Sequence, residues 1–262
     1  MHNIVCIKQV PDTREVRLDP KTGNLIREGV PSIINPEDKN AIEEALRLKD
    51  EFGGTVTVIT MGPPQAEEAL REALAMGADK AVLIGDRAFA GADTGATSYT
   101  LGCAINKLGK YDLILCGREA IDGNTAQVGP QLGEILGLPQ ITYVRKVVIR
   151  KNIIEAERAL EDGYEVVSTQ LPVLLTVVKE CNEPRIAAVA DIIEAYREKE
   201  VIAWSAKDVD GDKARIGLNG SWTRIRKAAA VKPQKGKVQI LEGSVGDVTK
   251  TLVAEFNKRN LL

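Results

Sequence analysis

Aromatic residues are scarce in this sequence of 262 residues: phenylalanine, tryptophan and tyrosine together make up 4% of it. The apolar residues, 44% of the chain, are therefore mostly valine, isoleucine, leucine and alanine. Such a core favours layered α/β packing, because small alanine-rich helix faces can lie close to a sheet. Histidine occurs once, as His2, which excludes histidine-based acid–base catalysis.

Paired cysteines and long apolar runs are also missing. The four cysteines are scattered and form no C-x-x-C motif, so the sequence indicates no metal or cluster site and fits a reducing cytoplasm. No apolar run approaches the length of a membrane span, and Lys8 interrupts the apolar core that a signal peptide would need. The net charge of −2 argues against a general nucleic-acid binder.

Strand-like and helix-like segments alternate through the first half of the chain. Continuous apolar runs predict strands at residues 3–10, 55–60, 80–84 and 111–116. Helical periodicity predicts helices at residues 36–52, 65–76 and from Asp93 or Thr94 to about residue 108. This alternation predicts a doubly wound, mostly parallel α/β sheet with helices on both faces, as in Rossmann-like folds.

The pattern changes after Gly137. Residues 141–150, 153–160 and 164–169 are short β-rich runs separated by turn-forming residues, which predicts an antiparallel insertion, and residues 173–178 predict another buried strand. Beyond Trp204 the chain has no long apolar run until a short helix near residues 245–257. Composition alone predicts that this part buries itself poorly, as a flexible tail would.

The segment Y-D-L-I-L-C-G-R-E-A-I-D-G-N-T-A-Q-V-G-P, residues 111–130, carries the most specific local pattern. It combines a buried strand, a loop of small and polar residues and a helix start, so helix N-terminal amides could bind an anion such as phosphate. Asp122, Asn124 and Thr125 could cap that helix or hold ribose and phosphate oxygens. The loop is neither a P-loop nor a G-x-G-x-x-G fingerprint. Its residues alone therefore fit either a nucleotide site or an ordinary strand-to-helix loop.

Several further motifs resemble one known family along the whole chain. They are V-C-I-K-Q-V-P-D at residues 5–12, N-P-E-D-K-N-A-I-E-E-A-L-R-L-K at 35–49, T-M-G-P-P at 60–64, A-L-A-M-G-A-D at 73–79 and A-E-R-A-L-E-D-G-Y-E-V-V-S-T-Q-L-P-V-L-L-T at 156–176. In this order they resemble the electron-transfer flavoprotein beta subunit. The resemblance implies an adenine-nucleotide-binding α/β domain at residues 1–203 and, at residues 204–262, an extended C-terminal arm that wraps an alpha subunit.

The resemblance also implies a cofactor site at the carboxyl ends of the strands. AMP binds there in many family members. The segment G-D-R-A-F-A-G-A-D-T-G-A-T-S, residues 85–98, looks instead like that of electron-bifurcating relatives, which hold FAD, and small Gly91 would let the backbone approach a pyrophosphate. We therefore expect FAD, with AMP as the alternative. The expected cofactor-binding residues are Cys6, Lys8, Asn35, Pro36, Glu37, Asp38, Met61, Thr94, Thr97, Gly117, Arg118, Glu119, Ala120, Ile121, Asp122, Gly123, Asn124, Thr125, Ala126, Gln127 and Val128.

A second functional segment is N-E-P-R-I-A-A-V-A-D-I-I-E-A, residues 182–195, which aligns with the family's recognition loop for dehydrogenases. Its apolar anchor falls on Val189, flanked by Arg185, Ile186 and Ile192. The alternative is an amphipathic helix packed on the subunit itself, because the apolar residues recur at near-helical spacing. Mixed charges at residues 194–200 replace the lysine cluster of many relatives, which puts the usual dehydrogenase partner in doubt.

The sequence is therefore identified as a member of this family, with no catalytic residue of its own. Together with the alpha subunit it would take electrons from NADH and pass them to ferredoxin or flavodoxin and to a flavin-dependent dehydrogenase. One alternative is a simple, non-bifurcating carrier that binds AMP. Another is a stand-alone ATP- or AMP-sensing module, which would not need the 156–176 motif.

Overall fold

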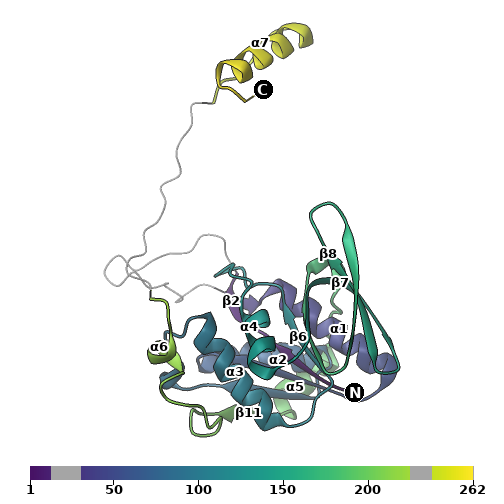
Figure 1. Cartoon of the computed structure of the whole chain (residues 1–262), viewed down its shortest axis with the longest axis vertical. Coiled ribbons are helices and arrows are strands. Elements are labelled where there is room, and N and C mark those ends of the chain that lie inside the picture. Colours follow the sequence, from purple (N-terminus) through teal and green to yellow (C-terminus); the bar gives the residue numbers. More distant parts are fainter. Residues whose placement is uncertain (13–30, 225–237, 262) are drawn as a thin grey trace.

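The computed structural model describes residues 1–12, 31–224 and 238–261. Its main feature is one nine-stranded sheet in the order β11-β5-β4-β1-β6-β10-β7-β8-β9 (Figure 1). The strands are β1 (His2–Cys6), β4 (Thr55–Met61), β5 (Lys80–Ile84), β6 (Leu113–Gly117), β7 (Gln140–Arg150), β8 (Ile153–Ala159), β9 (Tyr164–Gln170), β10 (Val173–Val177) and β11 (Val201–Trp204). The strands from β11 to β7 are parallel, and β7, β8 and β9 form an antiparallel meander. The predicted doubly wound α/β class with an antiparallel insertion is confirmed.

Helices cover both faces of the parallel strands. One face carries α1 (Pro36–Phe52) and α2 (Glu67–Met76), and the other carries α3 (Thr94–Leu108) and α4 (Val128–Leu136). The period-two alternation of β1 explains the two layers: Val5 packs in the cluster with α1 and α2, whereas Ile4 packs in the cluster with α3 and α4. Valine, isoleucine, leucine and alanine supply nearly all of both cores, as the composition predicts.

Helix ends fall where the sequence predicts them. Pro36 occupies the first turn of α1, and Gly77 ends α2 with φ of 122°, a conformation that favours glycine. The carboxylate of Asp93 caps α3 by accepting a hydrogen bond from the N–H of Ala96 at 3.0 Å. The described residues also form three short 3₁₀ helices: η1 (Pro64–Ala66), η2 (Arg87–Phe89) and η3 (Lys179–Cys181).

The expected single strand over residues 3–10 is wrong. The chain leaves the main sheet after Cys6 and forms a separate two-stranded sheet, in which β2 (Gln9–Pro11) pairs antiparallel with β3 (Ser32–Ile34). The backbone between them is diverted because the N–H of Lys8 donates to the Asp38 carboxylate at 2.7 Å and its carbonyl accepts from the N–H of Asn35 at 2.9 Å. The chain after β1 is thus hydrogen-bonded to the start of α1 at Lys8.

The C-terminal part is only partly separate from the α/β body. Val209 and Ile216 are buried in the core beside α3, and α6 (Gly217–Gly220) lies against the turn after β5. This part therefore buries apolar residues better than its composition predicts. In contrast, α7 (Val245–Lys258) lies apart from the body and has no buried residue (Figure 1). No helix among the described residues is long and apolar enough to cross a membrane.

Candidate functional site

A topological switch point lies at the centre of the sheet. From β1 the chain winds outward through β4 to β5, then returns to place β6 on the other side of β1. Helix α1 follows β1 on one face and α4 follows β6 on the other. Ligands of open α/β sheets bind in the crevice outside the carboxyl ends of two such strands. The expected site residues 6–8 and 117–128 lie at these ends.

The loop between β6 and α4 has an unusual backbone. Asn124 and Ala126 adopt φ of 46° and 51°, in the left-handed region. An ideal Cβ on Gly123 would meet no atom within 4 Å, so this position is open. Gln127, the N-cap of α4, gives no side-chain cap, and helix geometry leaves the N–H groups of Val128 and Gly129 without an acceptor inside the helix. This end of α4 therefore has unpaired amides of the kind that the anion-site interpretation requires, and anion binding there stays a prediction.

Asn35, Glu37 and Asp38 hold the beginning of the same loop from the first turn of α1. The amide of Asn35 donates to the carbonyl of Glu119 at 2.8 Å and accepts from the N–H of Ile121 at 3.0 Å. One carboxylate oxygen of Glu37 accepts from the N–H of Glu119 at 3.1 Å. Asp38 accepts from Gly117, as well as from Lys8. These polar groups face the protein rather than open solvent.

Asp38 is the most perturbed of these groups. Its side chain joins the ends of β1 and β6, because one oxygen accepts from the N–H of Lys8 at 2.7 Å and the other from the N–H of Gly117 at 3.0 Å. Burial raises the pKa of Asp38 to about 7, although both N–H donors favour its ionised form. Gly117 is required beside it, since a Cβ there would lie 2.8 Å from the backbone nitrogen of Asp38.

Carboxylates outnumber cations around the loop. Lys8 Nζ lies 2.7 Å from Asp122, and the guanidinium of Arg118 lies 3.1 Å from Glu37 and 2.8 Å from Glu119. Burial raises the pKa of Glu37, although the nearby N–H of Glu119 and the Arg118 charge oppose this. Both cations are thus paired. A phosphate at this crevice would depend on backbone amides of the described residues rather than on a free lysine or arginine.

Two buried cysteines lie below the crevice. Cys6 and Cys116 are register partners on β1 and β6, and both side chains belong to the core shared with α3 and α4. The neighbouring Cys6 thiol and burial raise the pKa of Cys116 well above its usual range. Cys116 is therefore a neutral packing group. The side chain of Cys6 is likewise in the core, so a ligand in the crevice would meet mainly its backbone.

The remaining expected cofactor residues lie on neighbouring elements. The hydroxyl of Thr94, at the start of α3, donates to the side-chain oxygen of Gln127 at 3.1 Å, so α3 contacts the loop directly. Thr97 follows one turn later in α3, with its N–H donating to the Asp93 carbonyl at 2.9 Å. Met61 ends β4 and lines a small cavity of about 90 Å³, whose wall also includes Lys8. The structure thus brings four separate loops to one edge of the sheet.

The turn after β5 is engaged with the C-terminal part of the chain. Gly91, with φ of 72°, faces Leu218, and a Cβ there would lie 3.3 Å from the Leu218 Cβ. The N–H of Leu218 also donates to the carbonyl of Ala90 at 3.1 Å. The expectation that the small size of Gly91 serves approach to a pyrophosphate thus has an alternative explanation in the structure, close packing against α6.

Asp93, which the sequence indicates only as a helix cap, also binds the C-terminal part of the chain. Besides capping α3, its carboxylate accepts from the backbone N–H groups of Trp222 and Thr223 at 2.8 and 2.9 Å. These bonds fix residues 221–223 beside the start of α3, while the Trp222 side chain is 99% exposed. A cap residue that also binds a segment 130 positions away leaves no mark in local sequence patterns.

The expected docking residues lie at the surface, in the loop that follows η3 and on α5 (Val189–Arg197). Arg185 is tied down by Glu43 at 2.8 Å and Asp50 at 2.9 Å, whereas Ile186 is 97% exposed and Val189 is 73% exposed. Helix α5 does contact α2, but its one buried residue is Ala195, and the apolar Val189 and Ile192 stay exposed. The helix therefore packs on the subunit through Ala195 while its larger apolar side chains remain outside, and docking on a dehydrogenase stays a prediction.

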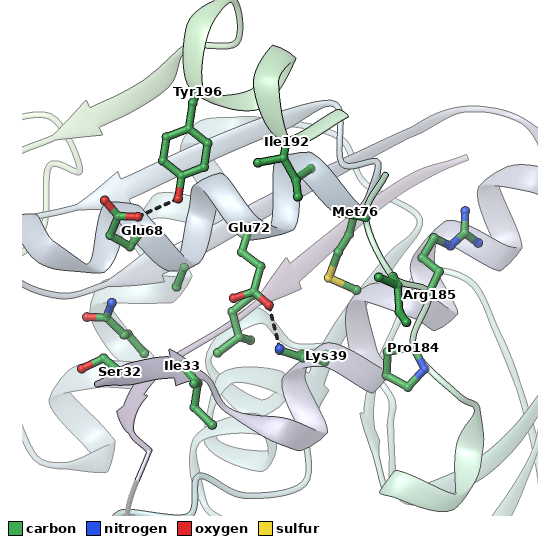
Figure 2. A pocket seen from close by; sticks show the side chains of 16 residues that line it. Ser32, Ile33, Lys39, Glu68, Glu72, Met76, Pro184, Arg185, Ile192 and Tyr196 are labelled. Atoms are coloured by element: carbon green, nitrogen blue, oxygen red, sulfur yellow. Dashed lines mark hydrogen bonds and ion pairs between the residues drawn. The ribbon is translucent and has the colours of Figure 1, made fainter. Parts of the chain in front are cut away.

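A cavity of about 540 Å³ lies beside this docking segment. Figure 2 shows Ile192 and Tyr196 of α5 above the cavity, Pro184 at its right, and residues of α1, α2 and β3 around the rest. Inside, Lys39 pairs with Glu72 at 2.6 Å and Tyr196 donates to Glu68 at 2.7 Å, which raises the pKa of Tyr196 to about 12. Arg185 points away from the cavity. Its wall shares Gln9 and Ser32 with the small cavity that Met61 and Lys8 line.

Comparison with known proteins decides the family. The family described as "Electron transfer flavoprotein domain" matches residues 22–209. The chain belongs to the electron-transfer flavoprotein beta subunit family. It is 55% identical to the electron transfer flavoprotein subunit beta of Clostridium acetobutylicum, over 100% of both chains. It is 51% identical to subunit CarD of the caffeyl-CoA reductase–Etf complex of Acetobacterium woodii, over 100% of both chains, and 48% identical to protein FixA of Bradyrhizobium diazoefficiens, over 93% of this chain and 87% of the relative.

Family membership makes this chain an electron-transfer flavoprotein beta subunit, which implies an alpha-subunit partner. The family is associated with flavin and nucleotide. The stand-alone sensor module considered from the sequence is not supported by these relatives, which match over nearly the whole chain.

Proposed function

We propose that the switch-point crevice binds FAD and that the chain works, with its alpha subunit, in flavin-based electron bifurcation. The observation that carries the proposal is the uncapped N-terminus of α4, with the open position Gly123 and the hydroxyl of Thr94 beside it. Amides at such a helix end suit a diphosphate. The resemblance of residues 85–98 to bifurcating relatives favours FAD over AMP.

The residues around the crevice could bind such a cofactor through backbone N–H groups as well as through side chains. Val128 and Gly129 would offer N–H groups to phosphate, and Thr94, Thr97 and Thr125 would offer hydroxyls. The bound flavin would supply hydride and single-electron transfer. The chain's own contribution is to hold and orient the cofactor, so we assign it no catalytic residue. Electrons would come from NADH and leave towards ferredoxin or flavodoxin and a flavin-dependent dehydrogenase, in the cytoplasm.

Partner contacts are proposed at two places. The exposed Val189 and Ile186, held in place by the anchored Arg185, would dock on the dehydrogenase. The exposed Trp222 and the helix α7, whose apolar residues are all exposed or half-exposed, would contact the alpha subunit from a C-terminal arm. Tryptophan at a rigid surface position is a frequent energetic anchor of protein interfaces.

Cofactor analysis of the purified heterodimer tests the main proposal. We expect the complex to release two FAD and no AMP per heterodimer, one FAD from each subunit. The measurement is the absorption spectrum together with separation of the released nucleotides. One FAD and one AMP per heterodimer would contradict bifurcation and favour the simple AMP-binding carrier, while leaving the family assignment intact.

A further inference from the structure

The first turn of α1 contacts the loop after β6 in a regular pattern. Its side chains accept hydrogen bonds from the N–H groups of Gly117, Glu119 and Ile121, at 3.0, 3.1 and 3.0 Å. These three positions are two residues apart, which is the spacing that a neighbouring strand would satisfy. Side chains of α1 thus satisfy N–H groups beyond the last register pair of β6 with β1, Cys116 with Cys6, while Gly117 still pairs with Val177 of β10.

We infer that Asn35, Glu37 and Asp38 are positioning residues, which hold residues 117–121 in the conformation that the cofactor needs, and that their side chains are not cofactor ligands. Each of the three side chains already has a partner in this loop. Asn35 and Asp38 are also buried, at 0% and 6% exposure. The inference rests on the proposed nucleotide site and assigns a different role to residues that the family resemblance places in it.

These hydrogen bonds fix the position of the loop after β6 relative to the sheet. Asp38 fixes Gly117 relative to Lys8, so the loop starts from the joined ends of β6 and β1. Asn35 then holds both sides of residue 120, through the Glu119 carbonyl and the Ile121 N–H. The next residues, from Asp122 onward, carry the left-handed conformations that lead into α4. Without these hydrogen bonds, residues 117–121 would no longer hold the following part of the loop, residues 122–127, in one position.

The chain offers a matched control on the same helix. Glu44 is also a buried carboxylate of α1, at 7% exposure, but it accepts from the Asn182 amide at 3.1 Å, far from the loop. The test compares Asn35→Ala, Glu37→Ala and Glu44→Ala in the heterodimer with the alpha subunit. Glu37→Gln serves as the conservative variant, since its amide oxygen can still accept from the Glu119 N–H.

Two readouts are needed: amide hydrogen exchange of residues 117–121 after nucleotide removal, and titration with FAD and with AMP. We expect Asn35→Ala and Glu37→Ala to speed exchange of the loop about fivefold or more, as one lost hydrogen bond would. The dissociation constant of the bound nucleotide should rise by a similar factor. Glu44→Ala should change neither quantity, and Glu37→Gln should restore both.

Weaker nucleotide binding with unchanged exchange in the nucleotide-free loop would overturn the inference, because it would show that the side chains are ligands. Faster exchange with unchanged binding would overturn it as well, since the loop conformation would then not matter to the nucleotide. If the wild-type heterodimer binds neither FAD nor AMP at this site, the proposed function fails instead. In that case amide hydrogen exchange alone shows whether Asn35 and Glu37 hold residues 117–121 in place.

Discussion

Replacing Gly117 with alanine should destabilise the protein through a steric clash that the structure defines. The new Cβ would lie 2.8 Å from the backbone nitrogen of Asp38 and 2.8 Å from the carbonyl carbon of Glu37. Neither is the end of a flexible side chain, so α1 and β6 must move apart. Overpacking of this kind costs about 1–3 kcal/mol, and a weakened bond from the Gly117 N–H to Asp38 adds about 1 kcal/mol.

The assay is thermal unfolding of the nucleotide-free protein at constant pH. A loss of about 2–4 kcal/mol should lower Tm by roughly 4–16 °C for a domain of this size. Gly123→Ala is the matched control in the same loop, because nothing lies within 4 Å of its Cβ position. It should leave Tm within about 2 °C of wild type. Equal Tm values for the two variants would refute the reasoning, since the close approach of α1 would then have no energetic consequence.

Two further predictions concern pH and partner docking. The folded-state pKa of Asp38 is raised to about 7 from 3.8, so its contribution to the free energy of unfolding should decrease by about 2–3 kcal/mol between pH 5 and pH 8. Asp38→Asn should remove this decrease, and parallel wild-type and variant curves from urea unfolding at several pH values would contradict it. Val189→Ala should slow electron transfer to the partner dehydrogenase about fivefold, from about 1 kcal/mol of lost apolar burial, without changing NADH oxidation by a dye. Val166→Ala, at an exposed valine of β9, is the control, and an equal loss in both assays would place Val189 inside the flavoprotein.

Elements defined by local chemistry could be predicted from the sequence. The bounds of α1 follow from Pro36 in its first turn and Gly53 after its end, and those of α3 from the Asp93 cap. The four central strands are long enough apolar runs to be recognised directly. The antiparallel meander could be predicted as well, because turn-forming residues such as Lys151 separate its strands.

The wrong prediction of a single strand at residues 3–10 shows that local sequence patterns do not contain the contacts between residues far apart in the chain. Apolar residues occur on both sides of Lys8 and Gln9, yet the chain turns there because Asp38, 30 residues later, accepts a hydrogen bond from the Lys8 N–H. The packing of α5 was ambiguous for a similar reason. Periodicity identifies its apolar positions but not that Ala195 is the one buried, since this depends on how closely α2 approaches.

The cofactor residues expected at the switch point could be located from the sequence, but their individual roles could not. Asn35, Glu37 and Asp38 look like a helix cap and an acidic first turn, and nothing local indicates that their partners lie about 80 residues later. The packing of the C-terminal part, beyond residue 204, was even harder to predict from the sequence. The burial of Val209 and Ile216 depends on a groove beside α3 that exists only in the folded sheet.

The two helix N-termini at the crevice differ in a way that favours one of them for an anion. The first turn of α1 contains Glu37 and Asp38, and its early N–H groups bond to the carbonyl of Asn35. The first turn of α4 contains no acidic residue and has no side-chain cap. Since phosphate is favoured by unpaired amides and opposed by nearby carboxylates, α4 is the end that suits it. In the proposed arrangement the acidic turn of α1 would hold the loop that leads to α4, which would explain why so many carboxylates surround the proposed anion site.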